Sequence, residues 1–291
     1  MSNVIYNGDY FKDAEVPINH QNRAFRYGDG LFETIRLING KPVFVRNHVQ
    51  RINEGLKYLG MNIPKSLVNG NLEHDLLDLA KKNGIEKGGS ARLTIWRDSS
   101  GKFMPVSDNS AFLLEIEPFP ENKFVLNKSG YSIDIFQDMK KQVNKMSKFK
   151  HLNSQMSVLA SVYARKKEMD DCLLINDEGM IIESTNSNIF IVRNGTLYTP
   201  PLSDGCVGGT MRMHLINAAL KLNIGTYESS LNQQHLLMSD EVLLTNAIRG
   251  VQWVNAFKHK RYFSKLAESL VDKINEMALE SISSDSDQTE N

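Results

Sequence analysis

The stretch that decides the fold opens with Lys150-His151-Leu152-Asn153 and closes with Glu183-Ser184-Thr185-Asn186-Ser187-Asn188-Ile189-Phe190. The first segment stands at the start of a predicted helix with one apolar face. That face consists of Met156, Leu159, Ala160 and Tyr163. The second segment lies on a predicted strand that follows the turn Asp177-Glu178-Gly179. An amine beside a packed helix and a carboxylate on a strand are both candidates for chemistry.

The composition is that of an ordinary globular protein. The chain has 291 residues, 41% of them hydrophobic and 23% charged, and Lys+Arg and Asp+Glu both number 34. This balance leaves no overall field that would attract nucleic acid or a membrane surface. The sequence has no apolar run of about 18 residues and no signal-peptide pattern at its start, so we expect a cytoplasmic location.

The two cysteines suggest neither a disulfide framework nor a metal site. Cys172 and Cys206 have no neighbouring Cys or His residues that would complete a ligand set. We therefore interpret both as small buried residues and predict no metal ion.

The first 117 residues read as an α/β domain. The predicted strands are 4–11, 30–38, 43–45, 91–96 and 111–117, with Asn39-Gly40 as a hairpin turn between the second and third. Apolar residues at helical spacing predict a helix that ends at Gly60, and a second pattern predicts a helix over 72–82. The Pro-containing segment 118–124 is interpreted as an interdomain linker.

Residues 125–280 read as a second, strand-rich domain. The predicted strands are 172–176, 180–184, 188–192 and 241–244, and Asn194-Gly195 is a second hairpin signal. Gly208-Gly209-Thr210 opens a predicted helix that reaches about Leu222, and 264–279 forms a terminal helix. The polar, acidic tail 281–291 is predicted to be disordered.

Lys150 is the first candidate for catalysis. By itself it belongs to a basic run from Lys140 to Lys150, which is typical of a solvated face; a nucleic-acid patch is the next interpretation, but aromatic partners are scarce there. A lysine anchored beside a packed helix can instead be desolvated, which favours the neutral amine that attacks an aldehyde.

Five segments in the same order resemble one family. The Lys-His-Leu-Asn and Glu-Ser-Thr-Asn segments are joined by Tyr27-Gly28-Asp29-Gly30-Leu31-Phe32-Glu33-Thr34-Ile35-Arg36, Gly208-Gly209-Thr210-Met211-Arg212 and Thr245-Asn246-Ala247. Together they resemble the class IV aminotransferases, the fold-type IV enzymes dependent on pyridoxal phosphate (PLP). The resemblance implies an α/β (α+β) fold, with a small N-terminal α/β domain and a larger strand-rich C-terminal domain that has a barrel-like core. It also implies a homodimer.

The same resemblance assigns the cofactor residues. Lys150 would carry PLP as a Schiff base, and Glu183 would keep the pyridine nitrogen protonated so that the ring can act as an electron sink. A helix N-terminus offers amides and a positive dipole end to a phosphate, and glycines allow close approach. The implied phosphate contacts are Arg51, Thr210, Met211, Asn246 and Ala247.

Candidate substrate residues lie on two predicted strands. Alternation places Phe32, Thr34 and Arg36 on one face of 30–38, with Glu33 and Ile35 on the other. Phe32 and Thr34 could therefore face substrate, with Thr34 also a catalytic candidate. The remaining candidates for substrate contact are Tyr27 and three basic residues, Arg92, Arg97 and Lys102. Basic side chains suit carboxylates.

Two reactions of the family compete. Thr34, the Lys-His-Leu-Asn segment and Asn246-Ala247 favour a 4-amino-4-deoxychorismate lyase, which expels pyruvate and leaves 4-aminobenzoate for folate synthesis. The stretch after Arg97 departs from the usual lyase pattern and leaves an amino acid aminotransferase, of the branched-chain or D-amino-acid type, as the alternative. A degenerate binding protein without turnover is a further alternative, disfavoured by the intact Lys150 and Glu183.

Overall fold

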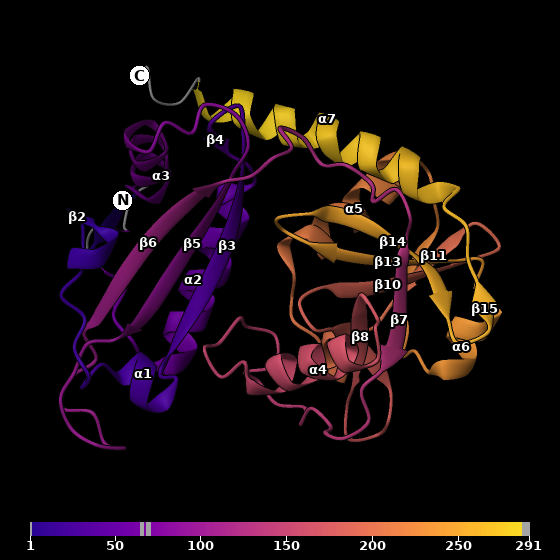
Figure 1. Ribbon diagram of the computed structural model, residues 1–291, viewed down its shortest axis with the longest axis horizontal. Coiled ribbons are helices and arrows are strands. Elements are labelled where there is room, and N and C mark those ends of the chain that lie inside the picture. The colour runs from indigo at the N-terminus through magenta and orange to yellow at the C-terminus, as the bar shows by residue number, and fades with distance from the viewer. Residues whose placement is uncertain (1, 65–66, 68–70, 287–291) are drawn as a thin grey trace. The chain divides into compact units, whose positions relative to one another are not determined.

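The computed structural model describes residues 2–64, 67 and 71–286. The chain divides into two compact units. Unit 1 comprises Met1–Lys123, Phe149–Asn153 and Ala278–Asn291, and unit 2 comprises Phe124–Lys148 and Ser154–Met277. Figure 1 follows the chain through both units. Lys150 thus clusters with the N-terminal unit, whereas a domain of 125–280 had been expected to contain it.

Unit 1 contains a six-stranded antiparallel sheet. Its order is β2-β1-β6-β5-β3-β4. The strands are β1 (Asn3–Tyr6), β2 (Asp9–Lys12), β3 (Gly30–Ile38), β4 (Lys41–Pro42), β5 (Gly89–Arg97) and β6 (Ser110–Pro118). β3 pairs with β5 along its length from Gly30↔Trp96 to Leu37↔Gly89. This register fixes which side chains share a face.

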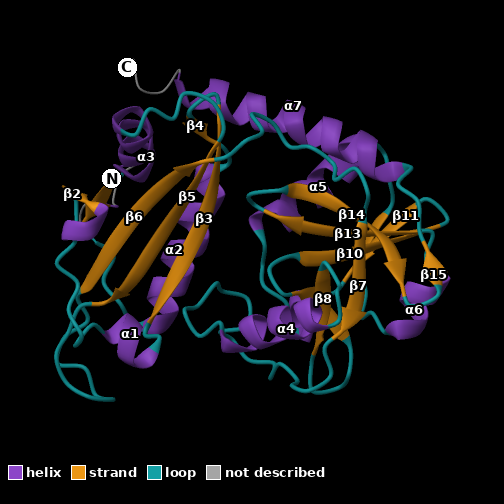
Figure 2. Ribbon diagram, viewed as in Figure 1, coloured by secondary structure: helices purple, strands orange, loops and turns teal. Residues whose placement is uncertain are grey.

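Three helices accompany this sheet. They are α1 (Arg23–Tyr27), α2 (Val45–Leu59) and α3 (Asn71–Lys82). α2 runs beside β3 (Figure 2) and buries Ile52 and Leu56. It ends where expected, at Gly60, whose left-handed φ of 63° lets its N–H bond back to the last turn.

Two predictions in unit 1 were wrong. The expected strand 4–11 is a hairpin, because Asn7 and Gly8 both adopt positive φ and turn the chain. The expected strand 43–45 is the start of α2: Phe44 is its N-cap, with φ 59°, and Val45 is already helical. Short apolar runs do not distinguish a strand from a buried helix start. The helix α1 was not predicted.

Unit 2 is built on a closed barrel of six strands. The ring runs β10-β13-β14-β7-β8-β9 and closes through the β9–β10 pair Glu183↔Asn188. Its strands are β7 (Tyr131–Ile135), β8 (Asp171–Ile175), β9 (Ile181–Ser184), β10 (Asn188–Arg193), β13 (Glu241–Asn246) and β14 (Gly250–Phe257). β7 pairs parallel to both β14 and β8, whereas the other pairs of the ring are antiparallel. The expectation of a barrel-like core is confirmed.

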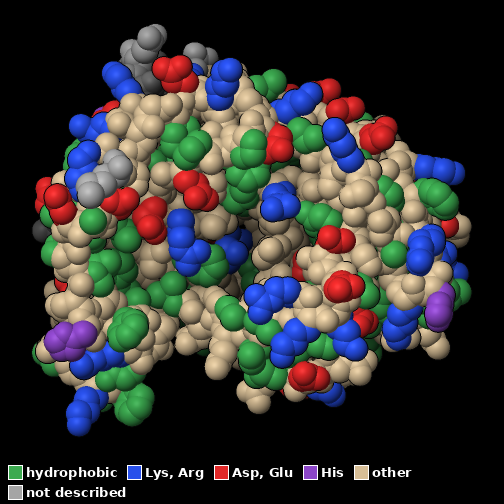
Figure 3. Space-filling model, in the orientation of Figure 1, with side chains coloured by type: hydrophobic (Ala, Val, Ile, Leu, Met, Phe, Trp, Pro, Cys, Tyr) green, Lys and Arg blue, Asp and Glu red, His purple; other side chains and the backbone are tan. Residues whose placement is uncertain are grey.

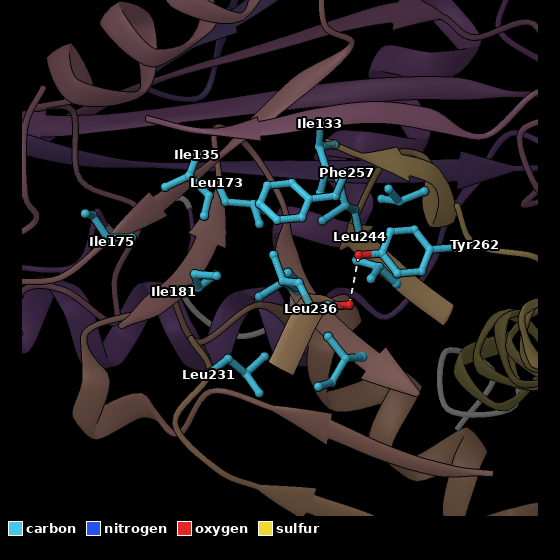
Figure 4. Close-up of a cluster of buried hydrophobic side chains, with 14 residues drawn as sticks. Ile133, Ile135, Leu173, Ile175, Ile181, Leu231, Leu236, Leu244, Phe257 and Tyr262 are labelled. Atoms are coloured by element: carbon cyan, nitrogen blue, oxygen red, sulfur yellow. Dashed lines mark hydrogen bonds between the residues drawn. The ribbon is translucent and has the colours of Figure 1, made fainter. Parts of the chain in front are cut away.

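One apolar cluster takes side chains from all six strands of the ring and so fills its interior (Figure 4). Ile133, Leu173 and Phe257 are fully buried in it. Tyr262 also joins it, and its hydroxyl donates to the carbonyl oxygen of Leu236 at 2.9 Å. Burial of such side chains stabilises the barrel by about 1.5–3 kcal/mol each.

The helix after Lys150 packs on the outside of β8 and β9. It is α4 (Gln155–Lys166), and its Ala160 and Ala164 are buried against Cys172, Leu174 and Ile182. Met156 and Tyr163 pack against the same cluster, as predicted. Leu159 does not: it is 42% exposed, because it lies one residue, about 100°, round the helix from Ala160.

The remaining elements of unit 2 lie around the barrel. They are β11 (Thr196–Thr199), α5 (Thr210–Lys221), β12 (Thr226–Glu228), α6 (Gln233–Met238) and β15 (Lys260–Arg261). The predicted hairpin at Asn194-Gly195 joins β10 to β11. β7, β12, β14, β15 and α6 were not predicted, although the sequence of β7 alternates apolar and polar residues.

The terminal helix is longer than expected. α7 (Leu266–Ser286) begins in unit 2, and its residues from Ala278 onward cluster with unit 1. The prediction of a disordered tail was wrong for 281–286, which continue the helix. Residues 287–291 lie outside the described residues.

The surface of the described residues shows the balance of charge that the composition indicates. Side chains of both charge signs are interspersed on the face drawn in Figure 3. Among the described residues, no helix combines the length and apolar character needed to span a bilayer.

A buried ionic network fastens α2 to β3. Arg51 binds Glu33 through two nitrogens, Nε to Oε1 at 2.7 Å and Nη2 to Oε2 at 2.6 Å. The Nδ1 atom of His48 lies 2.7 Å from Oε2 of Glu33. Burial alone would raise the pKa of Glu33, but the charge of Arg51 and the hydrogen bonds from His48 and Arg51 lower it to about 2. Burial also lowers the pKa of His48, against the pull of Glu33.

We expect Glu33→Gln to lower the free energy of unfolding by about 3 kcal/mol at neutral pH, which follows from the lowering of the Glu33 pKa from 4.5 to about 2. The pKa of Glu33 is lower in the folded than in the unfolded protein. The stability that ionised Glu33 contributes is therefore complete above the unfolded-state pKa, and it is lost as the pH falls through the folded-state pKa. Urea unfolding over a series of pH values measures it. The gap between wild type and variant should narrow below about pH 4.5. The exposed Glu86→Gln is the control, and an equal loss in both variants would contradict the prediction.

Candidate active site

Lys150 is attached to the edge of β3 by its own main chain. The amide of Phe32 donates to the carbonyl oxygen of Lys150 at 2.8 Å, and the amide of Leu152 donates to Gly30 at 3.1 Å. This approach requires glycine, because a Cβ on Gly30 would lie 2.1 Å from the carbonyl oxygen of Ile95 and 2.9 Å from Leu152. The Gly30 of the N-terminal signature and the Lys-His-Leu-Asn segment therefore meet in space.

Two cations lie over the ring of Phe32. Nζ of the half-buried Lys150 is 4.5 Å from the ring centroid, and the Arg92 guanidinium carbon is 4.2 Å from it. Such contacts hold a cation by attraction to the ring face. Burial lowers the pKa of Arg92, and nearby Glu115 opposes this. Lys150 and Arg92 thus share one face of the sheet with Phe32.

Thr34 belongs to the same face. It pairs directly with Arg92 across the β3–β5 ladder, so the two side chains point the same way. Glu33 points to the other side, towards α2. The alternation expected along 30–38 is confirmed, and it brings together Lys150, Phe32, Thr34 and Arg92.

Arg97 is held by the protein itself. Its Nε donates to Asp29 at 3.2 Å and its Nη1 to Asp108 at 2.6 Å, while Nη2 donates to the carbonyl oxygen of Leu59 at 2.7 Å. The residue is 7% exposed. These contacts engage all three guanidinium nitrogens of Arg97 with groups of the protein itself, and its contact with a substrate carboxylate stays a prediction.

Tyr27 and Lys102 have contacts at the loop 98–109, which joins β5 to β6. The Tyr27 ring is 5.6 Å from the ring of Phe103, and Arg23 lies over its face. The carbonyl oxygen of Lys102 accepts a hydrogen bond from Arg23 at 2.6 Å, and the Lys102 side chain is exposed. The contacts of both residues are thus with the loop and α1, whereas Lys150 contacts Phe32.

Glu183 is a buried carboxylate at the closure of the barrel. Its backbone pairs with Leu174 on one side and with Asn188 on the other. Oε1 lies 2.5 Å from Nζ of Lys141, and Oε2 accepts from the amide of Val207 at 2.8 Å. Glu183 itself is 7% exposed. A single carboxylate is thus held in one orientation by an ammonium group and an amide.

The expected phosphate contacts in unit 2 stand at the start of α5. The N-cap is Gly209, and no side chain caps the helix, so its first amides, those of Thr210 and Met211, face the N-terminal end. A Cβ on Gly209 would lie 2.0 Å from Oδ1 of Asn188, which explains the glycine. This donor set fits a phosphate.

The second expected turn follows β13. The Asn246 side chain accepts from the amides of Ile248 at 3.1 Å and Arg249 at 2.8 Å, which closes the turn. Its Nδ2 donates to Ser187 at 3.0 Å. Thr245 contributes a buried hydroxyl that has no hydrogen-bond partner among the described residues. A buried polar atom of this kind fits a site for a polar group.

Sequence reasoning missed the partners of the site residues. Lys141 was hidden in a basic run that resembles a solvated face. His48 and Arg51 stand three residues apart on α2, so their spacing could have indicated a shared face towards the sheet. Val207 contributes only its amide, which leaves no signal in the sequence.

The chain is similar in sequence to known proteins. The family model for amino-transferase class IV matches residues 30–257. A Methanocaldococcus jannaschii protein named "Putative branched-chain-amino-acid aminotransferase" is 27% identical, covering 83% of each chain. The aminodeoxychorismate lyase of Bacillus subtilis is 25% identical, covering 91% of this chain and 90% of its own.

The fold has counterparts among solved structures. The branched-chain aminotransferase from Thermoproteus uzoniensis, solved with norvaline, superposes with a TM-score of 0.88. It is 22% identical and covers 96% of this chain and 95% of its own. The match to the family model over most of the length places the chain in the class IV aminotransferase family, whose members are enzymes dependent on pyridoxal phosphate.

Proposed function

We propose that this enzyme is a 4-amino-4-deoxychorismate lyase, which releases pyruvate and forms 4-aminobenzoate. The observation that carries the proposal is the position of Thr34, on the face of β3 that also carries Phe32, opposite Arg92 in the ladder and beside the Lys150 contact. A hydroxyl there is suited to help move protons at the substrate. The Bacillus subtilis relative supports the same assignment.

The alternative is an amino acid aminotransferase. Two comparisons favour it, the Methanocaldococcus jannaschii relative and the Thermoproteus uzoniensis structure. Both reactions use the same cofactor residues, so the choice depends on groups that meet the substrate. Thr34 and Arg92 are the candidates for those groups on unit 1.

The candidate residues divide the proposed chemistry among them. PLP, when bound, supplies the electron sink that makes the carbon next to the substrate nitrogen acidic. Lys150 would hold the cofactor covalently and then, as a free amine, take the proton from that carbon at Nζ. Glu183 would accept a hydrogen bond from the protonated ring nitrogen. The α5 amides, the Asn246-Ala247 turn and Arg51 would bind the phosphate.

The proposed substrate contact of Arg92 rests on its charge. Arg92 carries a guanidinium on the Phe32 face, which suits a carboxylate of either proposed substrate class. Burial raises the pKa of nearby Glu115, and Arg92 opposes that rise. We further propose a cytoplasmic homodimer, in line with the sequence-based expectation.

Lys150→Ala should remove both the yellow colour of the bound cofactor and turnover, with activity falling by about 100-fold or more because the proton-transferring amine is lost. Absorbance of the purified protein and a turnover assay measure the two effects. Lys148→Ala, which changes an exposed lysine in the same run, should leave both unchanged. Activity retained in Lys150→Ala would refute the central assignment.

The lyase and aminotransferase reactions can be distinguished by their products. We expect pyruvate from aminodeoxychorismate without any 2-oxo acid acceptor, as measured by a coupled lactate dehydrogenase assay. Thr34→Ala should lower kcat by about 100-fold, while Thr34→Ser retains most of it because the hydroxyl remains. Conversion of the cofactor to pyridoxamine phosphate by leucine, glutamate or D-alanine, with no pyruvate release, would establish the aminotransferase instead.

A further inference from the structure

Lys141 is not a surface lysine. Its amide donates to the carbonyl oxygen of Ile175 at 2.9 Å, and its main chain forms a bridge with Asn176. Its side chain is 17% exposed and ends 2.5 Å from Oε1 of Glu183. The residue is therefore anchored to the barrel at its backbone and to the carboxylate at its tip.

The two donors on Glu183 act on different oxygens. Lys141 binds Oε1 and the amide of Val207 binds Oε2, at 2.5 and 2.8 Å. Because each carboxylate oxygen accepts two hydrogen bonds, both retain a lone pair for a further donor. With one donor on each oxygen, the carboxylate plane cannot rotate without breaking a bond.

The same network reaches the start of α5. The carbonyl oxygen of Val207 accepts from the side-chain amide of Asn188 at 2.7 Å, and the amide of Gly208 donates to Lys148 at 2.9 Å. Gly209, the next residue, is the N-cap of α5. The position of the Glu183 carboxylate is thus tied to the loop that leads to the proposed phosphate contacts.

A buried carboxylate needs a compensating charge. Removal of one partner of a buried ion pair is strongly destabilising, because it leaves an uncompensated charge in a poorly solvated place. A buried carboxylate without a cation also favours its neutral form. A neutral carboxyl group is a poorer acceptor for a protonated ring nitrogen than a carboxylate is.

We propose that Lys141 is a positioning residue that holds the Glu183 carboxylate in the orientation that receives the ring nitrogen of PLP. This inference rests on the proposed role of Glu183 as the partner of that nitrogen. Lys141 acts through Glu183 and does not touch the substrate in this assignment. Without Lys141, the carboxylate loses the donor that fixes its Oε1 atom, and the affinity for PLP falls.

The test compares Lys141→Met with Lys141→Arg, which restores the cation, and with Lys145→Met, an exposed lysine of the same run. PLP is titrated into each apo protein, and its dissociation constant is read from quenching of intrinsic fluorescence. We expect Lys141→Met to weaken binding about tenfold, a coupling of about 1.4 kcal/mol. Lys141→Arg should recover most of the affinity, and Lys145→Met should match wild type.

A double-mutant cycle separates positioning from general damage. In a Glu183→Gln background, Lys141→Met should have no further effect on PLP affinity, because the group that it positions is gone. Unfolding of each apo protein in urea provides a second readout, where the cycle should show the same coupling. Additive effects, or a Lys141→Met dissociation constant equal to that of Lys145→Met, would overturn this inference and leave the proposed function standing. Failure of wild type to bind PLP would overturn the proposed function and this inference with it.

Discussion

Several features of unit 2 depend on the contacts of one buried residue, Glu183. The backbone of Glu183 joins β9 to β10 and closes the six-strand ring, while its side chain is held by Lys141 and the amide of Val207. An ionised group can be kept inside a protein only when charge and hydrogen bonds compensate it. Barrel closure, the orientation of the carboxylate and the path of the loop into α5 therefore depend on the same few contacts.

Unit 1 also contains a buried carboxylate, Glu33, that is compensated by neighbouring side chains. Glu33 and Thr34 are adjacent on β3 but point to opposite faces, one into the network with Arg51 and His48, the other towards Arg92. The network holds α2 against the strand, so the opposite face is left for chemistry. Arg51, expected to meet a phosphate, uses two of its nitrogens to hold Glu33. Its orientation is thereby fixed before any ligand arrives.

Local signals were reliable where they had a local cause. Gly60 and Asn194-Gly195 mark element ends because the backbone geometry there depends on the residue itself. The errors arose where neighbours in space decide: 43–45 has strand-like residues but starts a helix, and Leu159 lies outside the buried cluster that α4 joins. The serine-rich residues 281–286 extend α7 although the composition of the tail suggested disorder.

The sequence alone determined the family, its cofactor and the order of the site motifs, because those depend on residue identity at a few positions. It also placed Phe32 and Thr34 on one face, since alternation along a strand is a local property. Only the tertiary structure decided the partners: Lys141 on Glu183, Glu33 on Arg51, and Asp29 and Asp108 on Arg97. These contacts join residues from separate parts of the chain, and the charge of a side chain does not reveal which opposite charge will be buried beside it.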